Sequence, residues 1–489
     1  HNGFPIPREL AKLERDIDYY SAVEILSEIL GKRETWRSRL NINIGPVLHI
    51  ILSKMLNYTN NPPLQLYAIH DASILPILLA LDSWDEAWPP FAADITFELH
   101  LQTSGPSYKP SSPHKVVEFE PNSQLDWSSV PFERLWVRVL YLGQPLPMTT
   151  TWMKGEVDLE EMTGSGDFIP LVEFVRRLAP FALSMEDFQA KCQENANKLK
   201  MDHRDGVRRL CCGRFPFFLI CLGRRDDRNP PWNIWKGNIW LSKIELNLVQ
   251  VQVFFRHGAR TPLHLVRSSL AHAEWTPDTT KDIPEVSIAM QHVDIYNRTP
   301  VDEASYDLIY RPIKLPGGES IGMLTSIGQK DLFYLGVELR KRYSGEGGIL
   351  SDPPKLNEIE TRSTRVGRNL KSIRSLVAGI CNNEADGVLV VPTMDFAAEV
   401  LFPNPKLNGD DTAYVEGTEE LRNDPDILAL KKKIREALKV DRLIDELDND
   451  PQKYSRDCQV YYVRDDYAAR KVGLIDQPFE LYLCSELGF

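Results

Sequence analysis

The feature that most constrains the fold is a strand that leads directly into a basic histidine motif. Residues 246–255 (LNLVQVQVFF) have the apolar, β-branched and aromatic composition of a buried strand. The strand is followed by the sequence RHGARTP at residues 256–262. Open α/β sheets bind ligands at the carboxyl ends of their strands. We therefore expect His257, with Arg256 and Arg260 on either side of it, to lie at a ligand site.

Each residue type in this motif has a physical use. Gly258 allows the backbone to approach a ligand closely. Guanidinium groups bind phosphate oxygens in pairs and stay charged at any working pH. A neutral imidazole between two such groups is a suitable nucleophile for phosphorus. The alternative is a core histidine beside surface arginines, and the match to five positions of RHGxRxP argues against it.

The RHGxRxP pattern resembles the signature of the histidine acid phosphatases. This resemblance implies hydrolysis of phosphomonoesters through a phosphohistidine on His257, with phosphoryl oxygens bound by Arg256 and Arg260 and with no metal or other cofactor. The phosphomutase branch shares RHG but lacks the R-x-P that follows, so Arg260 and Pro262 argue against a mutase. The implied fold is α/β, with a mostly parallel central sheet, helices on both faces and a smaller helical cap.

A second candidate element is the pair His70-Asp71. It follows the short apolar run 64–69 (LQLYAI), a predicted buried strand, and precedes an apolar helix predicted over about 72–81. An aspartate that only caps this helix is the structural alternative. The family resemblance implies that His70 binds phosphate and that Asp71 protonates the leaving oxygen, because an alkoxide leaves poorly without a proton.

A third candidate element is Arg362, the first residue of an Arg-Ser-Thr segment. The resemblance implies that Arg362 closes the phosphate pocket from the opposite side, where its charge offsets that of the phosphoryl oxygens. An arginine at a helix start with no role in the site is the alternative. Arg365 and Arg368 are interpreted as surface residues of the helix that follows.

Further segments extend the resemblance. Residues 324–343 are similar to the family pattern LTxxGxxQ…LGxxLRxRY, and residues 88–99 (WPPFAADITFEL) resemble the lysophosphatidic acid phosphatase branch. The branch resemblance implies lysophosphatidic acid as a substrate, and the family resemblance a secretory, lysosomal or mitochondrial location. The sequence leaves the physiological substrate, the compartment and the oligomeric state open.

The two halves of the domain stand in swapped order. In the family RHGxRxP lies near the start and the His-Asp pair near the end, whereas here His70 precedes His257. We predict four segments, which are a C-terminal half-domain at 1–198, a linker or non-native insert at 199–245, an N-terminal half-domain at 246–470 and an unmatched tail at 471–489.

Circular permutation and a fusion of two neighbouring phosphatase halves both explain this order. A non-catalytic relic is a third interpretation, if the halves never assemble. We expect them to form one domain with a single pocket, in which the strands 64–69 and 249–255 are parallel neighbours. The linker is expected to lie outside the core and residues 471–489 to pack poorly.

Composition narrows the partners. The net charge is −12, from 57 Lys and Arg against 69 Asp and Glu, which argues against an extended nucleic-acid surface. No run of 18 apolar residues is present, so the sequence predicts no membrane span. The seven cysteines form no paired CxxC set, which argues against structural zinc. The predicted partner is a small phosphomonoester held by a local group of positive side chains.

Periodicity predicts the remaining elements. Helices are expected at 7–30, 46–57, 168–178, 185–198, 321–344 and 424–440, and residues 362–380 are expected to form a turn that enters a helix. Further strands are expected at 94–100, 115–120, 134–142 and 388–391.

Overall fold

The computed structural model describes most of the chain. The described residues are 6–108, 131–148, 152, 166–202, 239–240, 244–267, 273–302, 305–395, 398–403, 411–447 and 458–472. The strand predicted at 115–120 lies outside them, as do most of the predicted linker and residues 473–489 of the predicted tail.

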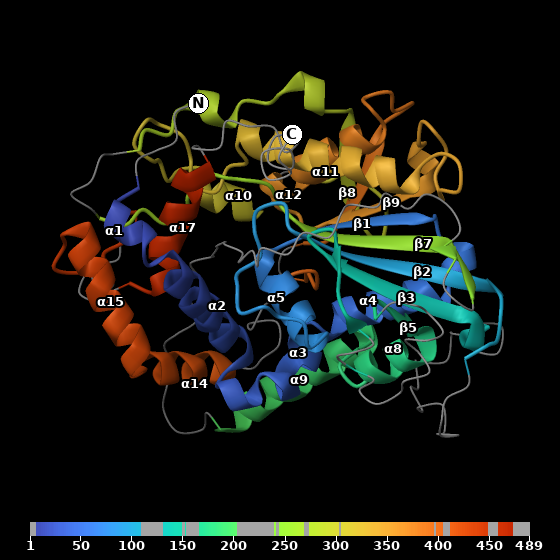
Figure 1. Cartoon of the computed structure of the whole chain (residues 1–489). Coiled ribbons are helices and arrows are strands. Elements are labelled where there is room, and N and C mark those ends of the chain that lie inside the picture. The colour runs from blue at the N-terminus through green and yellow to red at the C-terminus, as the bar shows by residue number, and fades with distance from the viewer. Residues whose placement is uncertain are drawn as a thin grey trace.

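The centre of the molecule is a mixed eight-stranded sheet with the order β4-β3-β2-β7-β1-β9, to which β5 and β6 are added at β3 and β7 (Figure 1). Its strands are β1 (Leu64–Ile69), β2 (Asp94–Ser104), β3 (Leu135–Tyr141), β4 (Gln144–Pro145), β5 (Phe168–Pro170), β6 (Ile239–Trp240), β7 (Glu245–Arg256) and β9 (Ile359–Ser363). Only the β1–β7 and β1–β9 pairs of this sheet are parallel.

The prediction of a mostly parallel sheet is therefore wrong. Strand β2 is antiparallel to both of its neighbours, β3 and β7. When helices cover both faces of a sheet, an apolar run has the same pattern in either strand direction. The pattern consequently identified these strands but carried no information about their direction.

Helices cover both faces of the sheet, with α11 and α12 on one side and α4 and α8 on the other (Figure 1). The helices are α1 (Arg8–Ala11), α2 (Glu14–Leu30), α3 (Leu40–Asn43), α4 (Gly45–Leu56), α5 (Asp71–Ala80), α8 (Leu171–Leu178), α9 (Met185–Asp202), α10 (Ser305–Tyr310), α11 (Ser326–Tyr343), α12 (Gly367–Ile380), α14 (Asp411–Arg422), α15 (Pro425–Leu438) and α17 (Val460–Val472).

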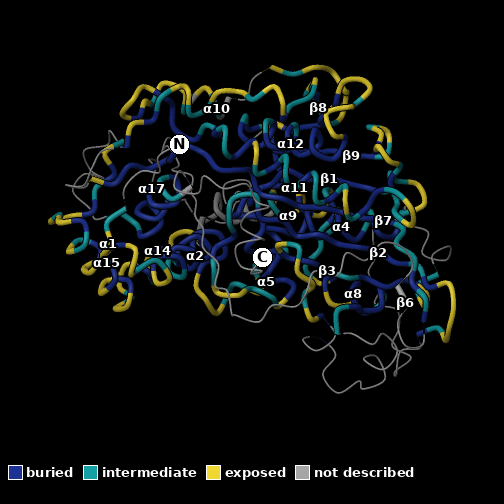
Figure 2. Tube along the Cα trace, turned by 45° about the horizontal axis from the view of Figure 1, so that its top comes forward, coloured by how far each residue is buried: buried dark blue, intermediate teal, exposed yellow. Residues whose placement is uncertain are grey.

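Strand β1 contributes side chains to the hydrophobic core on each face of the sheet. Its side chains alternate between the faces, so that Leu66 and Ala68 join the core that contains α12, while Tyr67 and Ile69 join the larger core on the opposite face. The whole strand is buried, as are the neighbouring parts of β7 and β2 (Figure 2). The carboxyl end of β1 therefore lies in the interior of the molecule.

Several boundaries differ from the predicted ones. The helix expected at 7–30 is broken at residues 12–13 into α1 and α2. The helix expected at 168–178 begins with strand β5. The segment 362–380 was predicted as a turn that enters a helix, but its first two residues complete strand β9 and α12 begins at Gly367. A separate parallel pair is formed by β8 (Met290–Asp294) and β10 (Leu389–Thr393).

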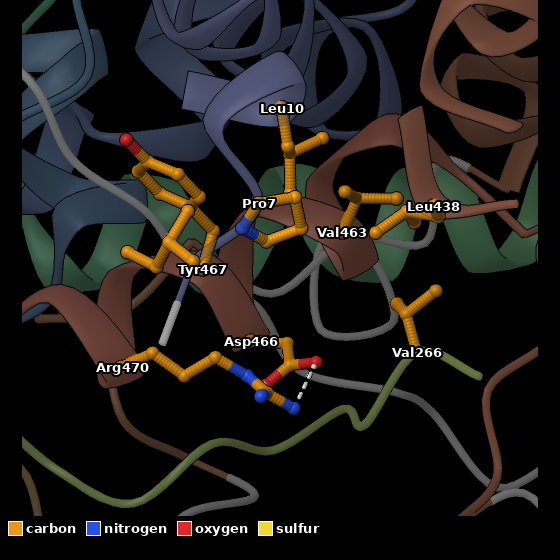
Figure 3. A pocket seen from close by; sticks show the side chains of 9 residues that line it. Pro7, Leu10, Val266, Leu438, Val463, Asp466, Tyr467 and Arg470 are labelled. Atoms are coloured by element: carbon orange, nitrogen blue, oxygen red, sulfur yellow. Dashed lines mark hydrogen bonds and ion pairs between the residues drawn. The ribbon is translucent and has the colours of Figure 1, made fainter. Parts of the chain in front are cut away.

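A helical layer beside the sheet joins the two ends of the described chain (Figure 1). In it, α17 packs antiparallel to α2, since Gln459 bonds to Glu28 near one end and Lys471 bonds to Glu14 near the other. A small apolar pocket next to these helices is lined from both chain ends, with Pro7 facing α17 (Figure 3). None of the described helices is long and apolar enough to cross a membrane.

Candidate functional site

Two neighbouring strands bring two histidines to the same edge of the sheet. Strands β1 and β7 are parallel, with Ile69 opposite Arg256, so that His70 and His257 are the next residues on their respective chains. Their imidazole centroids lie 5.8 Å apart, and both residues are buried. The prediction that the strands 64–69 and 249–255 are parallel neighbours is confirmed.

Gly258 lets the motif loop pack tightly against helix α11. A Cβ atom at this position would lie 2.2 Å from the carbonyl oxygen of Gly328, which is closer than any side chain can approach. The N–H of Gly258 donates to Oγ of Ser372 on α12 at 3.1 Å. A glycine is therefore required here for contact between the histidine loop and the helices behind it.

A segment from the first part of the chain fixes the same loop from the other side. The N–H of Ala92 donates to the carbonyl oxygen of His257 at 3.1 Å, and the N–H of Arg256 donates to that of Ala93 at 2.8 Å. The Arg256 guanidinium also donates to the carbonyl oxygen of Pro89 at 2.8 Å. Residues on both sides of the predicted linker thus hold the histidine motif in place.

The surroundings of His257 select one tautomer and one charge state. Its Nδ1 lies 2.9 Å from the carbonyl oxygen of Gly258, which can only accept, so Nδ1 carries the hydrogen and Nε2 keeps its lone pair. Burial lowers the pKa of His257 well below its usual value, and the charges of Arg368, Arg256 and Arg260 lower it further. The imidazole is therefore neutral with Nε2 available, which is the form a nucleophile needs.

His70 shares this electrostatic environment. Burial and the same three arginines lower its pKa well below the usual value. Its Nε2 lies 3.0 Å from Oγ1 of Thr364, and its ring meets that of Phe402 edge to face at 5.0 Å. Thr364 and Phe402 were not among the predicted site residues: Thr364 belongs to the Arg-Ser-Thr segment, of which only Arg362 was given a role, and Phe402 stands near no recognisable motif.

Asp71 faces Arg256 at the first turn of α5. Its Oδ2 lies 2.6 Å from Nε of Arg256, and its Oδ1 accepts the N–H of Ala72 at 2.8 Å. Burial raises the pKa of Asp71, and the positive charges of Arg256 and Arg260 oppose that effect. A carboxyl group with a raised pKa, held beside phosphate-binding side chains, is suited to deliver a proton.

Phe91 lies against the arginines of the motif. Its ring centroid is 4.2 Å from Cζ of Arg256 and 6.0 Å from Cζ of Arg260. The face of an aromatic ring attracts a guanidinium and restricts its orientation. Phe91 belongs to the segment at 88–99 singled out in the sequence, although no role was predicted for the ring itself.

The predicted third arginine, Arg362, contacts a different part of the interior. It lies on β9 opposite Tyr67, and its Nη2 donates to Oε1 of Glu399 at 2.8 Å. The charges that lower the pKa of the two histidines include those of Arg368, Arg256 and Arg260, whereas the charge of Arg362 lowers the pKa of Tyr67, which burial raises. The structure pairs Arg362 with Glu399, and its contact with phosphate stays a prediction.

Arg368 contributes the third charge near the imidazoles. It lies in the first turn of α12 and is only 6% exposed, so its interpretation as a surface residue is wrong. Arg365, in contrast, is half-exposed and donates to the carbonyl oxygen of Asp302. One signal pointed to Arg368, since a helix dipole disfavours a cation in the first turn and an arginine there needs another reason. We refer to Arg256, Arg260 and Arg368 as the arginine cluster.

This arrangement suits a small anion rather than a cation. The arginine cluster supplies fixed positive charge, and two neutral imidazoles and one carboxyl group lie beside it. Within the described residues, no group of three or more His, Cys, Asp or Glu side chains is placed to hold a metal ion. The groups present can bind phosphoryl oxygens, attack phosphorus and transfer a proton.

Comparison with known proteins agrees with this chemistry. Residues 247–458 match the model of a family described as "Histidine phosphatase superfamily (branch 2)". The match contains the RHGARTP motif and Arg368, while His70 and Asp71 lie outside it.

Individual relatives match over shorter stretches. Lysophosphatidic acid phosphatase type 6 from Bos taurus is 33% identical over 184 residues, which are 37% of this chain and 40% of the relative. The Homo sapiens protein of the same name is 35% identical over 159 residues, 32% of this chain and 37% of the relative. Counting factor 60 from Dictyostelium discoideum is 27% identical over 177 residues, 33% of this chain and 40% of the relative. The chain thus spans about two fifths of the length of these relatives.

Proposed function

We propose that the chain, whose residues 247–458 match branch 2 of the histidine phosphatase superfamily, hydrolyses phosphomonoesters through a phosphohistidine at the site described above. One observation carries the proposal. On His257, a neutral imidazole with Nε2 available lies near the arginine cluster and a second histidine, and the carboxyl group of Asp71 is ion-paired with Arg256.

In the first step His257 is the nucleophile. Its Nε2 forms a bond to phosphorus while the bond between phosphorus and the ester oxygen breaks. The N–H on Nδ1 keeps its hydrogen bond to Gly258, so the positive charge that develops on the ring faces a carbonyl oxygen. Because the pKa of His257 is lowered, the ring remains neutral and nucleophilic in acid solution.

Asp71 is the proton donor for the leaving oxygen. Its raised pKa keeps it protonated at acid pH, and its proton passes to the ester oxygen as that bond breaks. In the second step the ionised Asp71 takes a proton from water, which attacks phosphorus and breaks the bond to Nε2. Inorganic phosphate and free His257 are the products.

The arginine cluster and His70 hold the phosphoryl oxygens in both steps. Guanidinium groups spread positive charge over the equatorial oxygens, so the reaction needs no metal ion. We assign the third phosphate-binding position to Arg368, whose charge acts on both imidazoles, and keep Arg362, which is paired with Glu399, as the alternative that kinetics of the two variants distinguish. Arg362 also anchors the backbone near Phe402, since Glu399 accepts the N–H of Leu401.

The same proposal includes a single domain formed from residues 1–198 and 246–470. Strand β1 of the first segment lies between β7 and β9 of the second. Helix α17 ends beside the start of α2, in the antiparallel arrangement that a short connection between consecutive helices produces. Both features support one domain assembled from two segments, which a circular permutation and a fusion of two phosphatase halves would both produce.

The relatives named lysophosphatidic acid phosphatase make lysophosphatidic acid the first physiological substrate to test. A phosphomutase is a weaker candidate, because Arg260 and Pro262 complete the R-x-P that follows RHG and that the phosphomutase branch lacks. A non-catalytic relic remains the alternative if the site does not turn over.

The experiment is turnover of p-nitrophenyl phosphate and of lysophosphatidic acid by the full chain at acid pH, with and without EDTA. We expect release of inorganic phosphate that EDTA leaves unchanged and that vanadate inhibits. Binding of phosphate without turnover would favour the relic. Loss of turnover in EDTA with recovery on adding a divalent ion would contradict the arginine mechanism.

A further inference from the structure

One buried carboxylate on α17 binds the loop that follows the histidine motif. Oδ1 of Asp465 accepts from Nη2 of Arg260 at 2.6 Å. Its Oδ2 accepts the N–H of Leu263 at 2.6 Å and the N–H of His264 at 2.9 Å. Asp465 is 1% exposed and Arg260 is equally buried, so the ion pair is shielded from solvent.

This carboxylate fixes both the position and the orientation of Arg260. One oxygen holds the guanidinium, while the other holds the backbone three and four residues further along. The guanidinium is also bound through Nη1 to the carbonyl oxygen of Thr261 at 3.0 Å and lies against the ring of Phe91. Arg260 consequently has little freedom to rotate, which is the condition for paired hydrogen bonds to a phosphoryl group.

The position of Asp465 depends in turn on how α17 packs on α2. The carboxylate of Glu24 accepts the N–H groups of Val460 and Tyr461, at 3.1 and 3.0 Å, and so caps the start of α17. Arg464, directly before Asp465, forms a buried ion pair with Asp18. The helix that carries Asp465 is thus held by the opposite end of the chain.

We propose that Asp465 is a positioning residue for phosphate binding, which acts by orienting Arg260 and so couples the packing of α17 on α2 to the affinity of the site. The proposal rests on the proposed function, since it takes Arg260 to be a phosphate ligand. Asp465 does not itself touch the substrate. Its negative charge also offsets the concentration of positive charge around Arg260.

The neighbouring Asp466 provides a matched control. It is buried on the same helix, but its carboxylate pairs with Arg470, at 2.6 Å, and faces the small pocket near Pro7 (Figure 3). Asp465→Asn and Asp466→Asn therefore make the same chemical change one residue apart. Only Asp465→Asn removes the negative charge that pairs with Arg260.

The test measures the affinity of the full chain for inorganic phosphate by calorimetry, together with the melting temperature of each variant. We expect Asp465→Asn to weaken phosphate binding by about 10- to 100-fold, the scale on which a displaced binding group acts. Asp466→Asn is expected to keep the wild-type affinity, whatever its melting temperature. Wild-type affinity in a folded Asp465→Asn protein would overturn the proposal.

Two further variants cover the case in which Asp465→Asn does not fold. Asp465→Glu keeps the buried charge but moves it, and we expect weaker phosphate binding with a nearly unchanged melting temperature; unchanged binding would overturn the proposal. In an Arg260→Gln background, Asp465→Glu is expected to add little further loss, because its effect passes through Arg260. If Asp465→Glu weakens phosphate binding in the Arg260→Gln background as much as it does in the wild-type background, that result would also contradict the proposal. Wild-type protein that binds phosphate but hydrolyses no ester would contradict the proposed function alone.

Discussion

Two buried regions of this protein hold charged side chains and stabilise them in opposite ways. Around His257, the arginine cluster and burial keep the imidazoles neutral by lowering their pKa values. Between α2 and α17, the carboxyl groups of Glu24 and Glu28 are buried, and burial raises their pKa values. The region around His257 therefore contains several cationic side chains, whereas the interface between α2 and α17 contains carboxyl groups that are neutral when protonated.

The difference shows what each region requires. A buried carboxyl group can neutralise itself by taking up a proton, whereas a guanidinium stays charged at any working pH. The helix interface can therefore satisfy its own carboxyl groups in acid solution. The arginine cluster instead favours an anion from outside, and a phosphoryl group is the anion that the neighbouring nucleophile and proton donor suit.

The largest expected effect distinguishes Arg368 on α12 from Arg362 on β9. Arg368→Gln is expected to lower kcat/KM by on the order of 100- to 1,000-fold, as loss of one group that stabilises transition-state charge does. Arg362→Gln leaves Glu399 without its guanidinium, so we expect a lower melting temperature but a smaller loss of activity. Steady-state kinetics on p-nitrophenyl phosphate decide between them. A larger kinetic loss in Arg362→Gln would reassign the third arginine.

Next in size is the effect of Asp71→Asn. With both types of ester the variant lacks the base that hydrolyses the phosphohistidine, and with alkyl phosphates it also lacks the proton donor that their poor leaving group needs. We expect a fall of about 100-fold or more on an alkyl phosphate and a smaller fall on p-nitrophenyl phosphate. Equal losses on the two substrates would show that Asp71 has a different role.

In the proposed mechanism, His257 and Asp71 set the pH dependence of phosphatase activity in the wild-type protein. Activity needs neutral His257, whose pKa is lowered, so activity falls only when the pH drops through that lowered value. It also needs protonated Asp71, whose pKa is raised, so activity is lost as the pH rises through that value. A profile of kcat/KM is expected to show an acid optimum between the two. A maximum of kcat/KM in alkaline solution would contradict the directions of both pKa shifts.

The smallest expected effect concerns the helix interface. Burial raises the pKa of Glu28 from 4.5 to about 8. A carboxyl group with a raised folded-state pKa stabilises the fold below its unfolded pKa, and this stabilisation is lost as the pH rises towards 8. We expect the wild-type free energy of unfolding to fall by about 2 to 4 kcal/mol between pH 5 and pH 8. Glu28→Gln is expected to remove much of that fall.

Urea unfolding at the two pH values measures this dependence. Glu34→Gln is the control, because Glu34 is exposed just beyond the end of α2 and its loss leaves the interface intact. If the Glu28→Gln variant keeps the whole pH dependence of the free energy of unfolding, other groups cause that dependence. The role given to Glu28 in the helix interface would then be wrong.

The sequence predicted the parts of the site that follow directly from a strand. Strand β7 and its RHGARTP motif are contiguous, and so are β1 and the His70-Asp71 pair, which means that local pattern and position coincide. Arg368 was missed because the strand ends at Ser363 and the helix begins at Gly367, so its direction depends on a turn that apolar periodicity does not describe.

Other features depend on contacts between distant residues. Asp465 meets Arg260 across 205 positions of sequence, and Phe402 reaches the site from beyond β10. The direction of β2 depends on how the chain crosses the sheet, which the alternation of side chains does not record. In each case the missing information is tertiary; β2 was predicted as a strand at 94–100, whereas no element was predicted over α17 or around Phe402.

The most direct test of the central claim is to trap the phosphorylated protein. The Asp71→Asn variant is mixed with p-nitrophenyl phosphate, quenched with alkali and digested, because a phosphohistidine survives base and is lost in acid. We predict one base-stable, acid-labile phosphate on the peptide that contains His257, and none when His257→Ala is added to the same variant. Phosphate on another residue, or an equal amount of label without His257, would contradict the account.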